Sequence, residues 1–420
     1  MKLPAAWLIP VCGVLAASQA SAWEKYGIHS VYPAAISVQI NPSQISNQQL
    51  AAIKDAGFEY VRFGTRPPVS DKPQDFSELL ERLRKAQLKP IITLFGGATV
   101  WVQPKRMMSA TMTPLDAADN FSKFALTTLN QYADPNILWE LWNEPDNPTF
   151  LKPGMLQAGL VPAIQKICSA LEQQKGGVKK NIFGFGFAKL PNLQPKIPDD
   201  KLLAISLQNC LSGVSVHPYR KIPETLADDA TKSRELLHKY GKGELPMIAS
   251  EWGYSNFTAA RDQGGQAQLV LREYLSTVFA GIPLVNIYQW QDTGSDRAAR
   301  EQNYGLTDSS GQVKQALPAL KHLLGKLKDT QLAGSEKVGE AYQLVLNSQP
   351  GAAAKRSVHV VWSSAARSGP GGGFSIPRNK GQRCIISEFY PQQGDKPCPE
   401  GAGSVDINAG PSPLAVTLYD

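Results

Sequence analysis

The sequence predicts an α/β fold, namely a (β/α)8 TIM barrel that is followed by a small C-terminal β-sandwich. Three observations support this prediction. Short β-branched or aromatic runs alternate with longer helical segments from residue 24 to residue 328. About eight strand–helix units fit into this length, which suits a closed barrel of parallel strands. Beyond residue 329 the helical periodicity stops, and strand-like runs are separated by turns rich in Gly and Pro.

The first half of the barrel begins with an expected strand over 26–31. Ser46 is a candidate N-cap for a helix whose apolar residues follow at helical spacing, and Gly57 would end that helix. The later strands are expected at 60–63, 90–95, 137–142, 181–187, 214–217, 246–250 and 284–290. Helices are expected at 76–89, 114–132, 155–174, 225–240 and 264–280. The alternative is an open doubly wound sheet, but the first strand is not followed by a Gly-rich phosphate-binding fingerprint.

The C-terminal segment has short strand-like runs at 342–346, 358–362, 384–389 and 415–418. We therefore expect a catalytic barrel over 23–328 and a β-sandwich domain over 329–420. The N-terminus has a different pattern. Lys2 precedes an apolar run over 5–17, and small residues at 20–22 form an A-x-A cleavage site. The sequence thus predicts a signal peptide over 1–22 and a mature chain that begins at Trp23.

Export has consequences for the compartment and for the cysteines. We expect a periplasmic or extracellular protein without stable membrane insertion, because no apolar run approaches the ~20 residues that span a bilayer. Four cysteines remain after cleavage, and an even number in an exported chain indicates disulfides. Sequence proximity favours the pairs Cys168–Cys210 and Cys384–Cys398. Four buried free thiols are the alternative.

The charge balance bears on the partners. The chain has 43 Lys and Arg against 36 Asp and Glu, a formal net charge of +7, and its basic residues are scattered along expected helices. Because no dense basic run is interleaved with aromatic residues, we do not expect nucleic acid as a partner. A basic surface would suit an anionic polysaccharide, although ordinary solvation explains scattered charges equally well. We expect a monomer.

Two carboxylates stand out because active residues of such barrels lie at the C-terminal ends of strands. Glu144 and Glu251 follow the expected fourth and seventh strands, and Trp, Asn, Gly or Pro flank each of them rather than other charges. Glycoside hydrolysis needs one carboxylic acid to protonate the leaving oxygen and one carboxylate to attack the anomeric carbon. Arg62, at another strand end, would keep the attacking carboxylate ionised.

These residues lie in segments that resemble the clan A retaining glycoside hydrolases. The matching elements occur in order along the barrel: DAGFEYVR at 55–62, WELWNEP at 139–145, VHPY at 216–219, IASEWG at 248–253 and YGLTD at 304–308, followed by Gly311 and Lys314. With the C-terminal sandwich, the chain is most similar to glycoside hydrolase family 39 and to related endoglycosidases that cut biofilm exopolysaccharides. Some family 5 members share these elements too.

The resemblance implies roles for single residues. Glu144 would be the acid/base and Glu251 the nucleophile, and Asn143 would bind the sugar 2-hydroxyl. His217 and Tyr219 would line the pocket of the nucleophile, and Trp290 would form the floor of the subsite before the cleaved bond. Glu140 shares a strand face with Glu144, and the family pattern makes it a buried supporting residue.

Further residues are candidates for substrate contact. Trp101 and Trp252 could stack on sugar faces or could pack in the core, and His29 could touch substrate or complete the barrel core. The spacing of His29, His217 and Glu251 matches no zinc pattern, so we expect no metal and no other cofactor. A nucleophilic serine motif of the G-x-S-x-G type does not occur.

The sequence therefore predicts a secreted retaining glycoside hydrolase that cleaves a β-linked polysaccharide or oligosaccharide, with an exopolysaccharide as the expected substrate. A transglycosylase on the same residues is one alternative, and a catalytically inactive barrel that only binds polysaccharide is another. The presence of Glu144, Glu251 and Asn143 argues against the inactive barrel. Internal and terminal cleavage both stay open.

Overall fold

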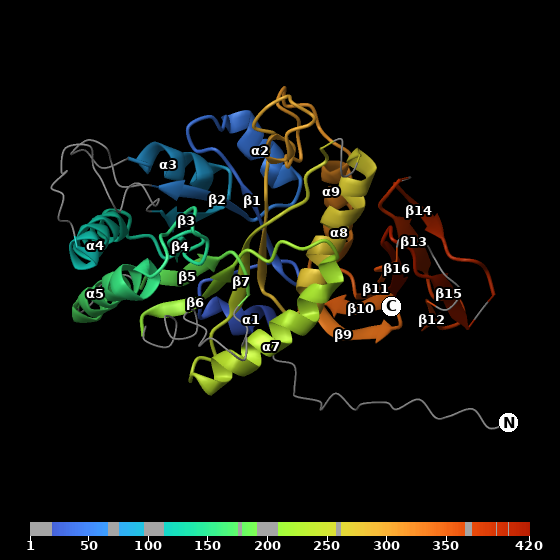
Figure 1. Cartoon of the computed structure of the whole chain (residues 1–420). Coiled ribbons are helices and arrows are strands. Elements are labelled where there is room, and N and C mark those ends of the chain that lie inside the picture. The colour runs from blue at the N-terminus through green and yellow to red at the C-terminus, as the bar shows by residue number, and fades with distance from the viewer. Residues whose placement is uncertain are drawn as a thin grey trace.

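Eight parallel strands close into a barrel in the computed structural model (Figure 1), which describes residues 19–65, 75–95, 113–174, 179–190, 209–257, 262–365, 372–391, 393–401 and 403–420. The strands are β1 (Ala35–Gln39), β2 (Tyr60–Thr65), β3 (Lys89–Leu94), β4 (Leu138–Leu141), β5 (Asn181–Phe187), β6 (Leu211–Val216), β7 (Met247–Trp252) and β8 (Leu284–Ile287). Pairing of β1 with both β2 and β8 closes the ring. The predicted TIM barrel is confirmed.

Helices surround this barrel. They are α1 (Gln19–Glu24), α2 (Asn47–Asp55), α3 (Ser77–Lys85), α4 (Pro114–Gln131), α5 (Val161–Gln173), α7 (Leu226–Lys239), α8 (Gln263–Phe279) and α9 (Ala316–Leu327), with short turns η1 (Leu156–Leu160), η2 (Pro223–Thr225) and η3 (Arg300–Gln302). The N-cap predicted at Ser46 is present. Its side chain accepts a hydrogen bond from the backbone of Gln49, whose side chain accepts from Ser46 in return.

The position of the first strand corrects the sequence analysis. Residues 26–31 form no strand but a turn at 26–27 and irregular backbone after it, and the first barrel strand is β1, at Ala35–Gln39. The chain turns at Gly27, whose φ of +83° is a left-handed conformation that glycine adopts without steric cost. The run over 26–31 resembles a strand in composition, yet β1 is the segment that lies between Pro33 and Pro42 and is buried along most of its length.

The N-terminal end of the barrel is closed by apolar side chains. A separate core cluster lies there. Except for Ile28, which precedes β1, its members are among the first three residues of their strands: Ile28, Ala35, Tyr60, Ile91, Leu138, Phe183, Ile248 and Leu284. We call these residues the barrel floor. Because the floor is packed with apolar groups, polar side chains can converge only at the opposite end, where the strands finish.

The C-terminal segment forms two antiparallel sheets, which confirms the predicted sandwich. The larger sheet has the strand order β14-β13-β16-β11-β10-β9, and the smaller one pairs β12 with β15. Their bounds are β9 (Thr330–Val338), β10 (Ala341–Ser348), β11 (Arg356–Ser363), β12 (Gly373–Pro377), β13 (Cys384–Glu388), β14 (Gly394–Pro397), β15 (Ser404–Asn408) and β16 (Leu414–Tyr419). The domain division at 328/329 stays a prediction; α9 ends at Leu327 and β9 begins at Thr330.

The larger sheet packs against α8 and α9, which lie between it and the barrel strands (Figure 1). Phe279 at the end of α8 contacts Tyr342 and Trp362 edge-on, with ring centroids 5.3 and 6.3 Å apart. Tyr342 and Trp362 are stacked at 5.5 Å. One core cluster therefore includes residues of both the barrel and this sheet.

Both predicted disulfides are present, Cys168–Cys210 and Cys384–Cys398. The first joins α5 to the residue before β6, and the second joins β13 to the residue after β14. Two disulfides are typical of a protein from an oxidising compartment. Among the described helices, none combines the length and the apolar character that a membrane crossing requires. Most of the predicted signal peptide, residues 1–18, lies outside the described residues.

Candidate active site

Glu144 and Glu251 meet at the C-terminal mouth of the barrel. Glu144 follows β4 by three residues, and Glu251 is the penultimate residue of β7. Each offers a carboxylate oxygen that, together with a ring nitrogen of His217, lies in a group whose atoms are all within 4.8 Å of one another. The glutamate side chains keep 13% and 17% of their surface exposed, so substrate can reach both.

The turn after β4 sets the direction of Glu144. Trp142 and Glu144 have φ angles of +73° and +49°, left-handed conformations that cost an L-residue on the order of 1–3 kcal/mol each. Two contacts hold this turn in place. The backbone N–H of Glu144 donates to the carbonyl of Gly186 at 2.8 Å, and the Trp142 side chain is completely buried. The strained backbone conformation of this turn therefore directs the Glu144 carboxylate into the barrel mouth.

Glu251 accepts two hydrogen bonds. The Arg62 guanidinium donates from Nη1 at 2.8 Å, and the Tyr219 hydroxyl donates at 3.0 Å. Charge-assisted bonds of this kind are stronger than neutral ones and fix the orientation of the carboxylate. An oriented, ion-paired carboxylate with one accessible edge is suited to nucleophilic attack.

Glu140 lies beneath this pair and is completely buried. Its Oε2 accepts from Nε and Nη2 of Arg62 at 3.0 and 2.6 Å and from the Thr93 hydroxyl at 2.8 Å. Burial alone would raise the pKa of Glu140, but the guanidinium outweighs burial and lowers this pKa to about 2. Glu140 therefore stays ionised at neutral pH and cannot serve as a proton donor.

Arg62 joins all of these groups. Besides Glu140 and Glu251 it donates to Gln39 Oε1 and to Asn143 Oδ1, both at 3.0 Å. Burial acts to lower the pKa of Arg62, yet the two carboxylates outweigh burial and raise it. A permanently charged guanidinium at this place connects β1, β2, β4 and β7.

Glu144 has different neighbours. His217 Nδ1 lies 2.9 Å from its Oε1, and the Asn147 side-chain amide donates to its Oε2 at 2.7 Å. Burial acts to raise the pKa of Glu144, but the contacts with His217 and Asn147 outweigh burial and lower it. The nearest neighbour of Glu144 is thus an imidazole that can itself exchange a proton, rather than an ion-paired guanidinium, and proton transfer at Glu144 is compatible with this arrangement.

The structure brings six predicted site residues together: Arg62, Asn143, Glu144, His217, Tyr219 and Glu251. His29 is not among them. Its backbone N–H donates to the hydroxyl of Tyr60, the first residue of β2, so His29 lies at the barrel floor. The substrate contact predicted for His29 is wrong. It assumed that 26–31 is the first strand and ends at the mouth, whereas the first strand is β1.

The tryptophan predictions also change. Trp252 is 0% exposed and Trp290 is 4% exposed, and both belong to the main hydrophobic core. Neither ring has an open face for a sugar, so we correct both stacking predictions to core packing. Trp101 lies outside the described residues.

Sequence reasoning missed two side chains at the mouth, Gln39 and Asn147, and placed a third, Tyr288, at a strand end without giving it a role. Gln39 is the last residue of β1 and accepts a hydrogen bond from Arg62, which was predicted. Gln39 itself was not recognised as a strand end, because the first strand was predicted at 26–31. Asn147 lies three residues beyond Glu144, a spacing that could have indicated a local hydrogen bond. Tyr288 is half-buried directly after β8, and the charge of Glu251 contributes to raising its pKa, although burial is the larger cause. In the sequence, Tyr288 is one of the polar residues at the ends of the expected strands. In the structure it is the aromatic residue near Glu251, a position that was expected for Trp290.

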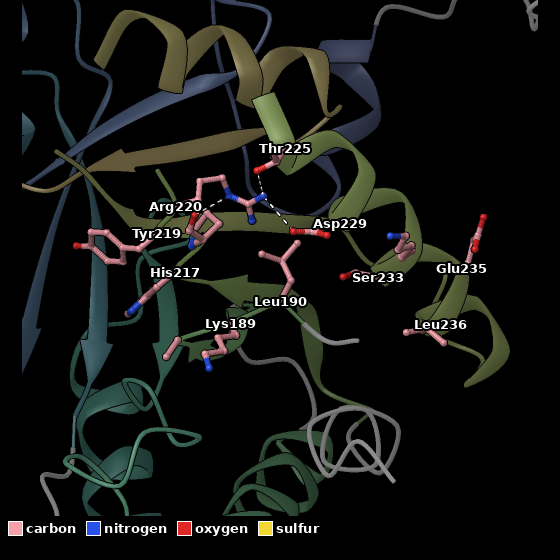
Figure 2. A pocket seen from close by; sticks show the side chains of 13 residues that line it. Lys189, Leu190, His217, Tyr219, Arg220, Thr225, Asp229, Ser233, Glu235 and Leu236 are labelled. Atoms are coloured by element: carbon pink, nitrogen blue, oxygen red, sulfur yellow. Dashed lines mark hydrogen bonds and ion pairs between the residues drawn. The ribbon is translucent and has the colours of Figure 1, made fainter. Parts of the chain in front are cut away.

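A cavity of about 610 Å³ extends from this site along α7 (Figure 2). His217 and Tyr219 line one end, and Glu235 and Leu236 of α7 line the other. Its remaining lining residues are Ala188, Lys189, Leu190, Pro218, Arg220, Thr225, Asp229, Lys232 and Ser233. The cavity thus begins beside the imidazole that contacts Glu144.

The group Glu144, His217 and Glu251 has the residue types that hold a metal ion. However, the guanidinium of Arg62 lies against Glu251, and a fixed positive charge there opposes a divalent cation. The hydrogen bonds of the three residues suit proton transfer rather than metal ligation.

Comparison with known proteins defines the class of fold. The chain shares its fold with a family 39 glycoside hydrolase from the gut symbiont Bacteroides cellulosilyticus, with a TM-score of 0.68 and 19% identity over 92% of this chain and 81% of that one. A glucosidase from Croceicoccus marinus follows at 0.62 and 12% identity, covering 93% and 96%. The catalytic domain of the GH30 xylanase C from Talaromyces cellulolyticus gives 0.57 and 10% identity, covering 94% and 98%. No protein-family model and no curated protein sequence matches the chain.

Proposed function

We propose that this protein is a secreted retaining glycoside hydrolase that cleaves a β-linked glycan by double displacement. The observation that carries the proposal is the apposition of Glu144 and Glu251 at the barrel mouth with unlike neighbours, an imidazole and an amide for one and a guanidinium and a phenol for the other. Oxygens within 4.8 Å of each other suit a retaining enzyme, whose carboxyl groups are roughly 5–5.5 Å apart.

The proposed reaction has two steps. In the first, Glu144 gives its proton to the glycosidic oxygen while an oxygen of Glu251 attacks the anomeric carbon, so that the leaving sugar departs as an alcohol and a glycosyl ester forms. In the second, Glu144 takes a proton from water, and the resulting hydroxide displaces Glu251 from the anomeric carbon. Two inversions give net retention of configuration.

Neighbouring side chains have supporting roles in this proposal. Asn143, held by Arg62, would bind the sugar 2-hydroxyl, a contact that strengthens in the transition state. Tyr219 would steady Glu251 as the ester forms and breaks, and His217 would do the same for Glu144. Tyr288 would border the site on the β8 side.

The substrate and the location belong to the same proposal. An N-terminal signal over 1–22, two disulfides and a basic net charge of +7 suit an exported enzyme that meets an envelope or extracellular glycan, with a biofilm exopolysaccharide as our proposed substrate. We propose residues 23–328 as the catalytic barrel and 329–420 as an accessory sandwich in a monomer. A transglycosylase would use the same residues but transfer the glycosyl group to a sugar hydroxyl instead of water.

Trapping of the glycosyl ester tests the proposal. A 2-fluoro glycoside with a good leaving group loses the 2-hydroxyl contact and destabilises the oxocarbenium-like transition state, so the ester should accumulate on Glu251. Mass spectrometry of the digested protein should find the label on the peptide that contains Glu251. Glu140→Gln is unsuitable as a control because of its contact with Arg62, so Glu244→Gln serves as the unrelated acidic control.

The anomeric configuration of fresh products gives a second readout. Proton NMR should detect retained configuration with a polysaccharide that the enzyme degrades, and Glu251→Ala should abolish turnover. Inverted products would mean that the second carboxylate activates water, and the double-displacement proposal would then be wrong. Longer products from a transfer to sugar, rather than new reducing ends, would favour the transglycosylase.

A further inference from the structure

The segment between β6 and α7, residues 217–225, contacts both glutamates of the site. His217 lies 2.9 Å from Glu144, and Tyr219 donates to Glu251 at 3.0 Å. A shift of this segment, which we call the β6–α7 loop, would therefore move the neighbours of both carboxylates at once.

Internal hydrogen bonds make the loop a single unit. Arg220 donates from Nε to the carbonyl of Pro218 at 2.9 Å and from Nη1 to Thr225 and Asp229 at 3.2 and 3.1 Å (Figure 2). The Thr225 hydroxyl also donates to the carbonyl of Ile222. The two ends of the loop are thus coupled through one guanidinium.

Glu224 anchors the far end of this loop, and its side chain is fully buried. Arg272 of α8 donates to its two oxygens at 2.7 Å each, and the indole N–H of Trp362 donates to Oε1 at 2.9 Å. A buried carboxylate is costly unless its lone pairs are satisfied, so each of these three bonds holds Glu224 in one position.

Trp362 belongs to β11 of the C-terminal sheet, and its ring is completely buried. Tyr342 stacks on this ring and Phe279 of α8 meets it edge-on, while the backbone of β11 is paired with β10 at this position. The donor to Glu224 is therefore fixed by the sheet itself, 138 residues away in sequence from the loop that it holds.

We propose that Trp362 is a positioning residue for the reaction, through which the C-terminal sheet holds the β6–α7 loop and thereby His217 and Tyr219 in register with Glu144 and Glu251. The inference rests on the proposed glycoside hydrolysis. It assigns the sheet a part in the catalytic centre rather than a separate role in binding polysaccharide.

Trp362→Phe is the most selective test, because it keeps an aromatic ring in the stack and removes the N–H donor. Misplacement of reacting groups by a fraction of an ångström is expensive, and about 1 Å can cost roughly 100-fold in rate. We expect kcat to fall about 10-fold with KM within twofold, because the groups that change act on the transition state.

Tyr342→Leu is the matched control. It removes the ring that stacks on Trp362 but keeps the indole N–H donor, the Glu224 acceptor and the backbone pairing of β11 with β10. We expect it to lower Tm at least as much as Trp362→Phe while kcat stays within twofold of the wild type. Equal kcat losses in the two variants that follow their Tm losses would reduce the effect to general destabilisation and overturn the proposal, as would an unchanged kcat in Trp362→Phe.

A readout without substrate separates this inference from the proposed function. The imidazole ¹⁵N resonances of His217, assigned with His217→Asn, should shift in Trp362→Phe and not in Tyr342→Leu. If the wild type were inactive on every glycan, the proposed function would fail while this measurement still decided whether Trp362 holds the loop. Unshifted resonances in Trp362→Phe would overturn the inference even for an active enzyme.

Discussion

At the scale of single residues, the two site glutamates differ in what surrounds them rather than in type. Glu251 accepts from a guanidinium that two carboxylates hold in the charged state, against the opposing effect of burial. Glu144 has only an imidazole and an amide as partners. A fixed positive charge suits a group that must stay ionised, and a neighbouring imidazole suits a group that must exchange a proton, so this difference supports the roles proposed for Glu251 and Glu144.

Glu144→Gln tests this assignment. An amide cannot protonate the departing oxygen, so turnover should fall most for substrates with poor leaving groups, by the roughly 100- to 10,000-fold that general acid catalysis supplies. Activated aryl glycosides should lose much less in their first step. Steady-state and burst kinetics with both substrate types measure the difference. Equal losses for the two types, with chemistry rate-limiting, would contradict the assignment.

Glu140 gives a prediction about acid stability. Its pKa is lowered from 4.5 to about 2 in the folded protein, because Arg62 outweighs the effect of burial. A depressed folded-state pKa adds stability that is fully present above about pH 4.5 and is lost as the pH falls toward 2. The contribution is up to about 3 kcal/mol, so urea unfolding midpoints should fall over this window.

Glu140→Gln should destabilise the protein at pH 7 and reduce the fall of the urea midpoint between about pH 4.5 and pH 2. The control is Glu81→Gln. Glu81 also has a pKa lowered to about 2, through Arg84, but its side chain is 45% exposed and that of Arg84 is 72% exposed, and solvent screens such a pair. We assign the pH dependence of the urea midpoint to the buried pair of Glu140 and Arg62. This assignment would be contradicted if Glu140→Gln left the dependence unchanged or if Glu81→Gln removed it.

At the scale of helices and strands, the sequence pattern correctly indicated the strand ends that carry Glu144 and Glu251, but it misplaced the first strand. Apolar strands followed by Glu144 and Glu251 were recognisable, because a buried run that ends in a polar residue is a strong local signal. The first strand was misplaced, since 26–31 has a strand-like composition while β1 has only five residues and includes Ser37 and Gln39. That error carried His29 to the wrong end of the barrel.

The tryptophans show a second limit of sequence-based prediction. Trp290 and Tyr288 both follow β8, and alternation alone cannot decide which ring faces the mouth when the chain no longer continues as a strand. Tertiary packing decides, and it buries Trp290 while Tyr288 stays half-exposed. Gln39 and Asn147 depend on contacts between elements or within a turn, for which a single sequence carries little signal.

The two disulfides differ in the length of chain that they close, 42 residues for Cys168–Cys210 and 14 for Cys384–Cys398. In the chain-entropy model, their loss costs about 4 and about 3 kcal/mol respectively. Double Cys→Ala variants of each pair should therefore unfold at lower urea concentrations than the wild type, with the first pair losing more. Chemical denaturation under non-reducing conditions measures this.

The segment that the first disulfide closes contains β5 and ends directly before β6, the strand that leads to His217, so removal of this disulfide should affect activity. The second disulfide lies within the C-terminal sheet and serves as the control, since its loss should leave kcat unchanged. The reverse order of stability losses, or four free thiols in the purified protein, would contradict the prediction.

At the scale of the whole molecule, the barrel and the larger C-terminal sheet share one hydrophobic core. The shared cluster contains Phe63 and Trp139 of the barrel as well as Leu344, Val358 and Val360 of the sheet. Domains that share a core in this way cannot unfold separately without exposing apolar surface, which costs about 25 cal/mol per Å². We therefore expect one cooperative unfolding event.

Differential scanning calorimetry checks this expectation. The thermogram should contain one transition whose van't Hoff and calorimetric enthalpies agree. Trp362→Phe and Tyr342→Leu should shift this transition without splitting it. Two resolved transitions in the wild type would mean that the sheet is an independent domain, and would weaken the proposed role of the interface in the active site.

The barrel floor has a practical consequence for engineering. Its apolar residues, among them Ile28, Phe183 and Leu284, occupy the starting ends of the strands, whereas Arg62, Glu144 and Glu251 lie at the finishing ends. Mutational searches for heat tolerance can therefore be confined to one pole of the molecule and searches for altered substrate preference to the other. Gains from the two libraries should combine nearly additively, because sites more than about 7–10 Å apart without shared partners seldom interact.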